Sequence, residues 1–247
     1  MREIEPYKIK IADRIAQVTP LFESTKAYCQ KYLCDGDADF YITVTADDLI
    51  FEQEMLDIEA REEGLKLRKF TAPFLERAAI QRKLAGELVK HDILLLHGST
   101  VAVDGQAYLF TAACGTGKST HTRLWRETFG DRAAMVNDDK PFLAISANGV
   151  TAYGSPWSGK HGLDSNIAVP LKGICILYRG DVNEIHEIQP KEATAMLRHQ
   201  SFLAQQADEE KVYSLVDRLM EQVSLWEMRC TKSQEAAITA HAAMSGK

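Results

Sequence analysis

The sequence predicts an α/β fold with a mixed sheet, preceded by a small α+β module at the N-terminus. Between residues 71 and 247, short runs rich in β-formers alternate with amphipathic helical segments. Two pairs of these runs are separated only by tight-turn dipeptides, Asp104-Gly105 and Asn148-Gly149, which predict antiparallel hairpins. Strands joined by hairpins as well as by helices favour a mixed sheet. We place the small module at 1–70 and the larger domain at 71–247.

The first 70 residues contain two expected strands and one charged segment. Tyr7–Ala12 alternates as a strand does, and Phe40–Val44 is rich in β-formers. Glu52–Lys69 is dense in charge with scattered apolar positions, which is typical of a solvated helix or a mobile connector. We find no residues with evident chemistry in this module.

The larger domain begins with an amphipathic helix over Thr71–Lys90, with Pro73 near its start. Further helices are expected at His121–Phe129, Lys191–Gln205 and Lys211–Val223. Strands are expected at Ile93–Leu96, Val101–Val103, Ala107–Phe110, Ala133–Val136, Phe142–Ile145, Val150–Tyr153, Gly173–Tyr178 and Leu225–Cys230. A polar, glycine-rich loop is expected over Gly154–Asn166.

Composition and charge exclude several classes of protein. The net charge of −6, with scattered Lys and Arg, argues against a nucleic-acid partner, because phosphate backbones need a basic face. No run is long enough to span a membrane, and Met1–Glu5 lacks the apolar stretch of a signal peptide. Five widely spaced cysteines suit reduced thiols better than a disulfide framework. We therefore expect a cytoplasmic protein with no membrane partner.

A candidate phosphate-binding loop follows the expected strand at Ala107–Phe110. Glycines in such a loop let backbone N–H groups turn towards a polyphosphate, and the following helix N-terminus adds its dipole. Lys118 is expected to reach the β- and γ-phosphates, and the Ser119 hydroxyl is expected to ligate Mg²⁺. The predicted nucleotide-binding residues are Cys114, Gly115, Thr116, Gly117, Lys118, Ser119 and Thr120.

Ala112 stands where the usual pattern G-x-x-x-x-G-K-[ST] has its first glycine. Alanine fits there only if the backbone keeps a negative φ. The tripeptide Gly-Lys-Ser occurs by chance in many chains. The prediction therefore depends on the strand before the loop and the helix after it.

Two adjacent carboxylates, Asp138 and Asp139, follow the expected strand at Ala133–Val136. Phosphoryl transfer needs a phosphate cradle, a metal, an in-line nucleophile and a proton acceptor. One carboxylate can hold Mg²⁺, and the other can take a proton from an attacking hydroxyl. Most Asp-Asp pairs are solvated turn residues, but this one ends a strand downstream of the loop, which favours function. A lone histidine at a strand end, such as His97, is more often a hydrogen-bonded structural residue. A solvated role for Lys160 in its polar loop is as frequent as a functional one.

Taken together, these segments resemble the HPr kinase/phosphorylase family of the phosphoenolpyruvate carboxykinase-like superfamily of P-loop kinases. The resemblance extends from about His97 to about Leu177. It is carried, in the order of the family, by Leu96-His97-Gly98, Val101-Ala102-Val103, Ala112–Ser119 and Val136–Asp139. The resemblance implies a kinase core of that type, with ATP and Mg²⁺ as cofactors. It also implies that Asp138 is the base, that Asp139 and Ser119 serve the metal, and that His97 supports the base or the transferring phosphoryl group.

Two departures from that family bear on the substrate. Ala112 replaces a glycine, and the downstream Arg-Gly-x-Gly signature is absent, with Gly154–Gly162 in its place. Lys160 in this loop is a candidate for stabilising the transferred charge. The changed loop argues against HPr as the partner. Similar short HPr-kinase-like proteins are associated with phosphorylating serine in proteins or peptides, so the resemblance implies a serine hydroxyl of a protein or peptide as acceptor.

Two other functions stay open at this point. One is a nucleotide-binding regulatory module that has lost transfer activity, and the other is a kinase of a free small molecule. The presence of both aspartates and His97 favours catalysis, since a nucleotide sensor has no need for a base. Members of the family form oligomers, so the resemblance also implies a homo-oligomer.

Overall fold

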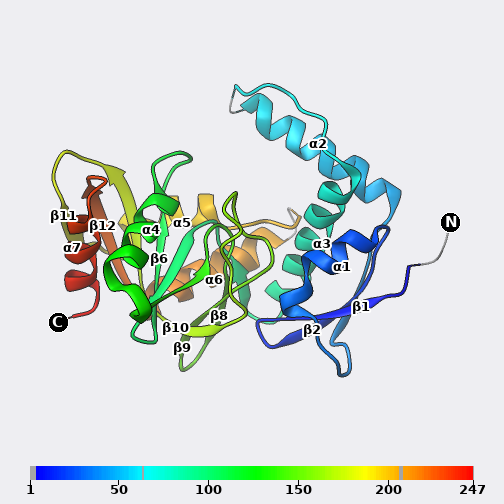
Figure 1. Cartoon of the computed structure of the whole chain (residues 1–247), viewed down its shortest axis with the longest axis horizontal. Helices are drawn as coiled ribbons and strands as arrows, with labels where there is room; N and C mark the ends of the chain where they lie inside the picture. Colours follow the sequence, from blue (N-terminus) through cyan, green and yellow to red (C-terminus); the bar gives the residue numbers. More distant parts are fainter. Residues whose placement is uncertain (1–3, 63, 206–207, 247) are drawn as a thin grey trace.

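The computed structural model describes residues 4–62, 64–205 and 208–246. A small three-stranded sheet lies at the N-terminal end of the molecule, and a larger curled sheet occupies the rest (Figure 1). The larger sheet contains parallel and antiparallel pairs, so the predicted mixed α/β fold is confirmed. None of the helices in the described ranges combines the length and apolar character needed to cross a bilayer.

The small sheet has the order β1-β2-β3. Its strands are β1 (Tyr7–Ile11), β2 (Arg14–Thr19) and β3 (Phe40–Thr43). The short helices α1 (Glu23–Tyr28) and η1 (Gln30–Tyr32) connect β2 to β3. The sequence did not predict β2, because the preceding turn places Ala12 and Asp13 at positive φ (48° and 61°) without any glycine.

Two helices, α2 (Ala46–Glu62) and α3 (Ala72–Val89), lead from the small sheet to the large one. The charged segment expected over Glu52–Lys69 is therefore helical only as far as Glu62. The buried stripe of α3 packs Ile80 and Leu84 into a cluster that also contains Ile9 and Phe142. One hydrophobic cluster thus joins both sides of the boundary that we predicted at residue 70.

The large sheet has the order β4-β8-β9-β10-β6-β5-β7, with β12 paired to β10 and β11 paired to β12. Its strands are β4 (Ile93–Leu95), β5 (Ser99–Val103), β6 (Gln106–Thr111), β7 (Ala133–Asn137), β8 (Phe142–Ser146), β9 (Gly149–Tyr153), β10 (Ala168–Arg179), β11 (Glu184–Glu187) and β12 (Ser224–Cys230). Both predicted hairpins, β5/β6 and β8/β9, are present. The long strand β10 pairs with β9 near its start and with β6 and β12 further on, which joins the two parts of the sheet.

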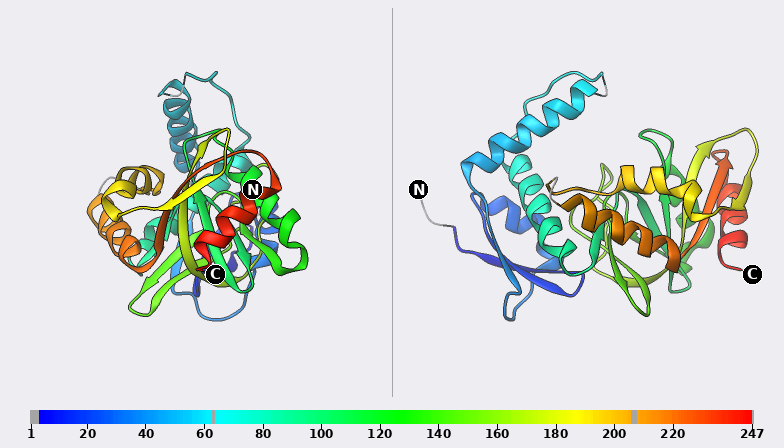
Figure 2. Two further views of the ribbon diagram at one scale, coloured as in Figure 1. Left: turned by 90° about the vertical axis from the view of Figure 1, so that its left-hand side faces the viewer. Right: turned by 180° about the vertical axis from the view of Figure 1, so that it is seen from behind.

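Helices cover both faces of this sheet. They are α4 (Lys118–Phe129), followed by the short η2 (Gly130–Arg132), α5 (Pro190–Gln200), α6 (Glu209–Gln222) and α7 (Gln234–Met244). Alternation along β6 sends Leu109 towards α5 and α6, and sends Tyr108 and Phe110 towards α4 and α7. Figure 2 shows these two helix pairs on opposite sides of the sheet.

The C-terminal elements differ from the prediction in three places. Helix α5 ends at Gln200 rather than Gln205, because Ser201 is already extended (φ −79°, ψ 134°). Strand β11 was not predicted, since most of its side chains are exposed. Helix α7 was also missed, because its buried face consists largely of alanines, which give a weak hydrophobic periodicity.

Candidate functional site

Four strands of the large sheet end at one edge. Strands β6, β10 and β12 are parallel, and β7 shares the direction of β6 because both are antiparallel to β5. In open α/β sheets, ligands bind outside the carboxyl ends of the strands. The predicted loop follows β6, and the Asp138-Asp139 pair follows β7, so the topology brings both to this edge.

The loop from Ala112 to Thr120 has the backbone that the sequence predicts. Gly115 and Gly117 lie at positive φ (73° and 126°), which other residues rarely adopt. Ala112 is buried and has a negative φ, so the condition for an alanine at the start of the loop is met. Helix α4 begins at Lys118, and no side chain caps its first turn. Backbone N–H groups there are available to an anion.

The side chain of Lys118 lies across this loop. Lys118 is 9% exposed, and its Nζ donates a hydrogen bond to the carbonyl oxygen of Ala112 at 3.1 Å. Burial lowers the pKa of Lys118, while the neighbouring Asp139 carboxylate opposes that change. Arg179, at the end of β10, donates from Nη2 to the carbonyl oxygen of Gly115 at 2.7 Å. The sequence did not single out Arg179, because nothing local marks a residue that reaches the loop from another strand.

The turn after β7 is shaped by Asn137. Its Oδ1 accepts hydrogen bonds from the backbone N–H of Asp139 (2.8 Å) and of Lys140 (2.6 Å). Its Nδ2 donates to the carbonyl oxygen of Ser155 at 2.9 Å. Asn137 therefore sets the turn that presents both aspartates. An asparagine before two turn residues is a recognisable signal of such a turn, and the sequence analysis did not use it.

Asp138 is a buried carboxylate with one free oxygen. The residue is 3% exposed, and Oδ1 accepts a hydrogen bond from the backbone N–H of Gly159 at 2.6 Å. Oδ2 is buried and has no hydrogen-bond partner among the described residues. Burial raises the pKa of Asp138, and the adjacent Asp139 charge acts in the same direction. A carboxylate in this state is a better proton acceptor than an ordinary aspartate.

Asp139 is perturbed in the opposite direction. Burial acts to raise its pKa, but the hydrogen bond from His97 and the charges of Lys140 and Lys118 outweigh burial, and the net pKa is lowered. The distance from His97 Nε2 to Asp139 Oδ1 is 3.2 Å. Asp139 therefore stays ionised, as a metal-binding carboxylate must.

The backbone holds His97 beside Asp139. The N–H of Gly98 donates to the carbonyl oxygen of Asp139 at 2.9 Å, and Thr111 Oγ1 donates to the carbonyl oxygen of His97 at 3.0 Å. A Cβ at Gly98 would lie 2.9 Å from Leu109 Cδ2 and 3.1 Å from the carbonyl oxygen of Phe110, so a larger residue would have to displace these neighbours. His97 thus contacts the carboxylate expected to serve the metal, and no contact joins it to Asp138 among the residues described.

Two hollows border the candidate site residues. One, of about 560 Å³, lies beside the start of α4 and the ends of β10 and β12. Its lining includes Thr116, Thr120, Leu177, Arg179, Thr231 and Lys232. The other, of about 420 Å³, lies on the Asp139 side. Its lining includes Tyr28, Phe74, Arg77, Lys140, Trp157 and Lys160.

The remaining predicted site residues are placed as follows. Lys160 is exposed and lines the second hollow, which Asp139 also lines. Lys160 makes no ion pair within the described parts of the chain. Cys114 is exposed on the loop, and Ser119 and Thr120 lie in the first turn of α4. No hydrogen bond joins Ser119 to Asp139 in the described ranges, and no cluster of three or more His, Cys, Asp or Glu side chains is found there.

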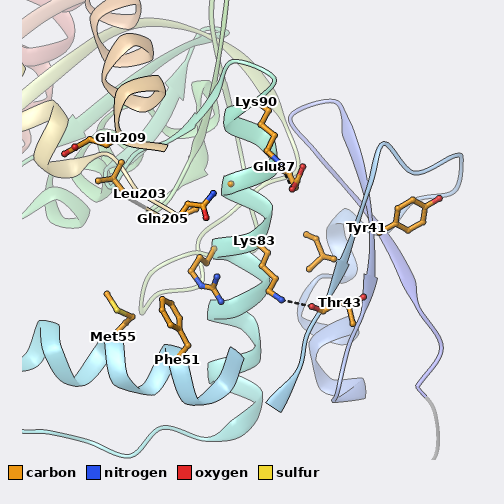
Figure 3. Close-up of a pocket in the computed structure, with 14 residues that line it drawn as sticks. Tyr41, Thr43, Phe51, Met55, Lys83, Glu87, Lys90, Leu203, Gln205 and Glu209 are labelled. Carbon is orange, nitrogen blue, oxygen red and sulfur yellow. Dashed lines mark hydrogen bonds and ion pairs between the residues drawn. The ribbon is translucent and has the colours of Figure 1, made fainter. Parts of the chain in front are cut away.

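A wider hollow, of about 920 Å³, lies away from these residues, between β3, α2, α3 and the segment around Leu203 (Figure 3). Its basic side chains already have partners. Lys83 Nζ donates to the carbonyl oxygen of Thr43 at 2.8 Å, and Lys90 pairs with Glu87 at 2.8 Å. None of the predicted site residues lines this hollow.

Comparison with known proteins identifies the family. The model of the family described as SynChlorMet cassette protein ScmC matches residues 79–240. The chain belongs to the ScmC family. The ScmC match includes every predicted site residue from His97 to Lys160. The family whose model matches is therefore ScmC and not the HPr kinase/phosphorylase family.

Two further comparisons complete this assignment. No curated protein matches this ScmC-family chain. A solved structure that matches is the Hpr(Ser) kinase/phosphatase from Coxiella burnetii, with 11% identity and a TM-score of 0.36. The match covers 62% of this chain and 93% of that one. This similarity is distant, so the chemistry of the site has to be argued from its own residues.

Proposed function

We propose that this ScmC-family protein is an ATP- and Mg²⁺-dependent kinase that transfers the γ-phosphoryl group to a hydroxyl, with serine of a protein or peptide as acceptor. One observation carries the proposal. Two neighbouring carboxylates with oppositely shifted pKa values lie at the sheet edge that also bears the glycine loop and Lys118. A nucleotide sensor needs the loop but has no use for a buried base.

The residues present fit a nucleotide and its metal. Positive-φ glycines and an uncapped helix N-terminus suit a polyphosphate, and Lys118 is close enough to Asp139 for the two charges to interact. Ser119 and Asp139 offer oxygen ligands, which Mg²⁺ prefers. When bound there, Mg²⁺ would neutralise charge on the phosphate oxygens. His97 orients Asp139 for that role.

In the proposed step, Asp138 takes the proton of the acceptor hydroxyl. The hydroxyl oxygen forms a bond to the γ-phosphorus of ATP while the bond from that phosphorus to the β,γ-bridging oxygen breaks. ADP leaves with the bond electrons, and the products are a phosphate ester and ADP. Lys118 and Lys160 provide positive charge on the two sides of the transferred group, where negative charge spreads in the transition state.

Two separate hollows are available to donor and acceptor. The nucleoside of ATP fits the hollow beside α4, β10 and β12, since that hollow borders Thr116 and Gly117 of the loop. The acceptor then enters from the hollow that borders Asp139. In-line transfer requires the nucleophile and the leaving group to lie on opposite sides of phosphorus, and separate hollows allow donor and acceptor to bind at the same time.

The test is incubation of the protein with γ-labelled ATP, Mg²⁺ and a set of serine peptides, proteins and small alcohols. We expect label on a polypeptide, and loss of that label by at least about 100-fold in Asp138→Asn and in Lys118→Ala. Lys172→Ala is the matched control, because Lys172 is exposed in β10 and belongs to neither hollow. Nucleotide binding with no transfer would favour a regulatory module, and label on a metabolite would select a small-molecule kinase.

A further inference from the structure

The hollow on the Asp139 side is lined by several cations. Arg77, Lys140 and Lys160 line it, and none of the three forms an ion pair among the residues described. In the hollow of Figure 3, by contrast, Lys83 and Lys90 are both matched by carboxylates. Three cations without an ion pair in the described ranges thus lie beside the candidate catalytic residues.

Arg77 is held in place without using its hydrogen-bond donors. Its guanidinium lies over the ring of Tyr28, 4.5 Å from the centroid, and 5.8 Å from that of Phe74. Its backbone carbonyl accepts a hydrogen bond from Trp157 Nε1 at 2.8 Å. No hydrogen bond of the guanidinium occurs within the described ranges. A guanidinium fixed by stacking, with its N–H groups free, is a ready partner for a carboxylate.

Lys140 provides a second positive charge in the same hollow. Its backbone N–H is fixed by Asn137 at 2.6 Å, and the one hydrogen bond of its Nζ among the described residues goes to the side-chain amide oxygen of Gln81, at 3.5 Å. The single acidic side chain in the lining is Asp139, which the proposed function commits to the metal. The hollow therefore has an excess of positive charge for an incoming group.

We propose that the acceptor is a peptide segment with an acidic side chain close to its serine, and that Arg77 and Lys140 bind that carboxylate. The volume of about 420 Å³ and the aromatic lining suit a few residues of an extended chain. Arg77 stacks on Tyr28 and Phe74, so the hollow presents a positive charge beside its aromatic surface. It therefore selects a peptide with an anionic side chain over a purely apolar one. The inference rests on the proposed function, because a phosphoryl acceptor presupposes a kinase. Binding of the acidic peptide is nevertheless testable by itself.

The first measurement is binding, followed by fluorescence anisotropy of labelled serine peptides that carry Glu, Gln or Lys at the positions beside serine. The Glu peptide is expected to bind at least about tenfold more tightly than the Gln peptide, and to lose this advantage at high salt. Arg77→Gln should remove the advantage, whereas Arg61→Gln, on the exposed end of α2, should keep it. Arg77→Glu should instead prefer the Lys peptide, which a variant that merely misfolds cannot do.

The second measurement is transfer of label from γ-labelled ATP to the same peptides. Faster labelling of the Glu peptide, with the order reversed in Arg77→Glu, supports the proposal. Equal binding of all three peptides, no binding, or equal labelling of all three overturns it. A preference for the Glu peptide in binding, with no label transferred to any acceptor, overturns the proposed kinase function while the acidic-peptide site stands.

Discussion

Asp138 and Asp139 are neighbours in the chain, yet their surroundings give them different chemistry. Asp138 is buried with an unpartnered oxygen, and its pKa is raised. Asp139 receives the hydrogen bond of His97, and its pKa is lowered. Two carboxylates whose environments move their pKa values apart are suited to different roles. The assignment of the base to Asp138 and the metal to Asp139 therefore has a physical basis in this site.

The raised pKa of Asp138 predicts how activity depends on pH. A base acts only when deprotonated, so kcat/KM should fall as pH falls through the pKa of Asp138 in the native protein. Because that pKa lies above the ordinary value of 3.8, the acid limb should lie at higher pH than an unperturbed aspartate gives. A pH profile of label transfer checks this. An acid limb at or below the ordinary pKa would argue against Asp138 as the base.

The same shift predicts an effect on stability. A raised pKa means that the native state binds the proton more tightly than the unfolded state, so this stabilisation is present at low pH and is lost as pH rises through the native pKa. At neutral pH, Asp138→Asn should therefore be more stable than the wild type, with a higher Tm. The difference should shrink as the pH is lowered.

Thermal unfolding at several pH values, followed by circular dichroism, measures this difference. Asp131→Asn is a suitable control, since Asp131 is exposed in η2 and should give the wild-type Tm. A variant Asp138→Asn that is less stable than the wild type at neutral pH would contradict the conclusion that burial disfavours the ionised form of Asp138.

At the scale of elements, the loop between β9 and β10 supports the site through tight backbone packing. A Cβ at Gly154 would lie 1.8 Å from the carbonyl oxygen of Ser165 and 2.8 Å from that of Val136. The backbone N–H of Ser165 in turn donates to Val136 at 3.1 Å. The loop is thereby fastened to β7, and it carries the Gly159 N–H that binds Asp138.

Gly154→Ala should therefore displace this loop, with a loss of stability of about 3 kcal/mol or more and a loss of transfer activity. Gly162→Ala is a comparison within the same loop. Gly162 lies at φ +62° with nothing within 4 Å of an added Cβ, so its substitution should cost only about 1–2 kcal/mol. Urea unfolding of both variants measures the contrast. Equal losses in the two variants would mean that packing against Ser165 and Val136 does not determine the loop.

At the scale of the whole molecule, the N-terminal segment forms part of the wall of the hollow on the Asp139 side. Tyr32 Oη donates to Asp164 Oδ2 at 3.0 Å, and Lys31 Nζ donates to the carbonyl oxygen of the same residue. Tyr28 also lines the hollow. The sequence analysis assigned no chemistry to residues 1–70. Tyr28 and Tyr32 meet the loop that follows β9 only in the folded protein, and nothing local in the sequence indicates that contact.

The shared hydrophobic cluster predicts cooperative unfolding of the whole chain. Ile9 and Ile42 from the small sheet pack in one cluster with Leu84, Leu95 and Phe142. Separation of the two parts would expose these side chains to water. Urea unfolding should therefore give one transition, with tryptophan fluorescence and far-UV circular dichroism coinciding. Two separate transitions would instead support the division at residue 70 that the sequence predicts.

Part of the fold was predictable because it depends on local signals. The hairpin turns at Asp104-Gly105 and Asn148-Gly149 and the helix at His121–Phe129 are present as predicted. Within this helix, Trp125 and Phe129 are four residues apart and pack together, with ring centroids 5.5 Å apart. Elements without such signals, including β2 and α7, were missed because their pairing and packing partners lie elsewhere in the chain.

The sequence by itself determined the glycine-containing loop at Ala112–Thr120, the hairpins and most of the succession of strands and helices. These follow from glycine placement, turn chemistry and hydrophobic period within short windows. Only the tertiary structure decided that Arg179 binds the loop, that His97 contacts Asp139 rather than Asp138, and that Tyr28 and Arg77 line the hollow beside them. These contacts join residues distant in the chain, and burial, which separates the pKa values of the two aspartates, exists only once the strands have assembled.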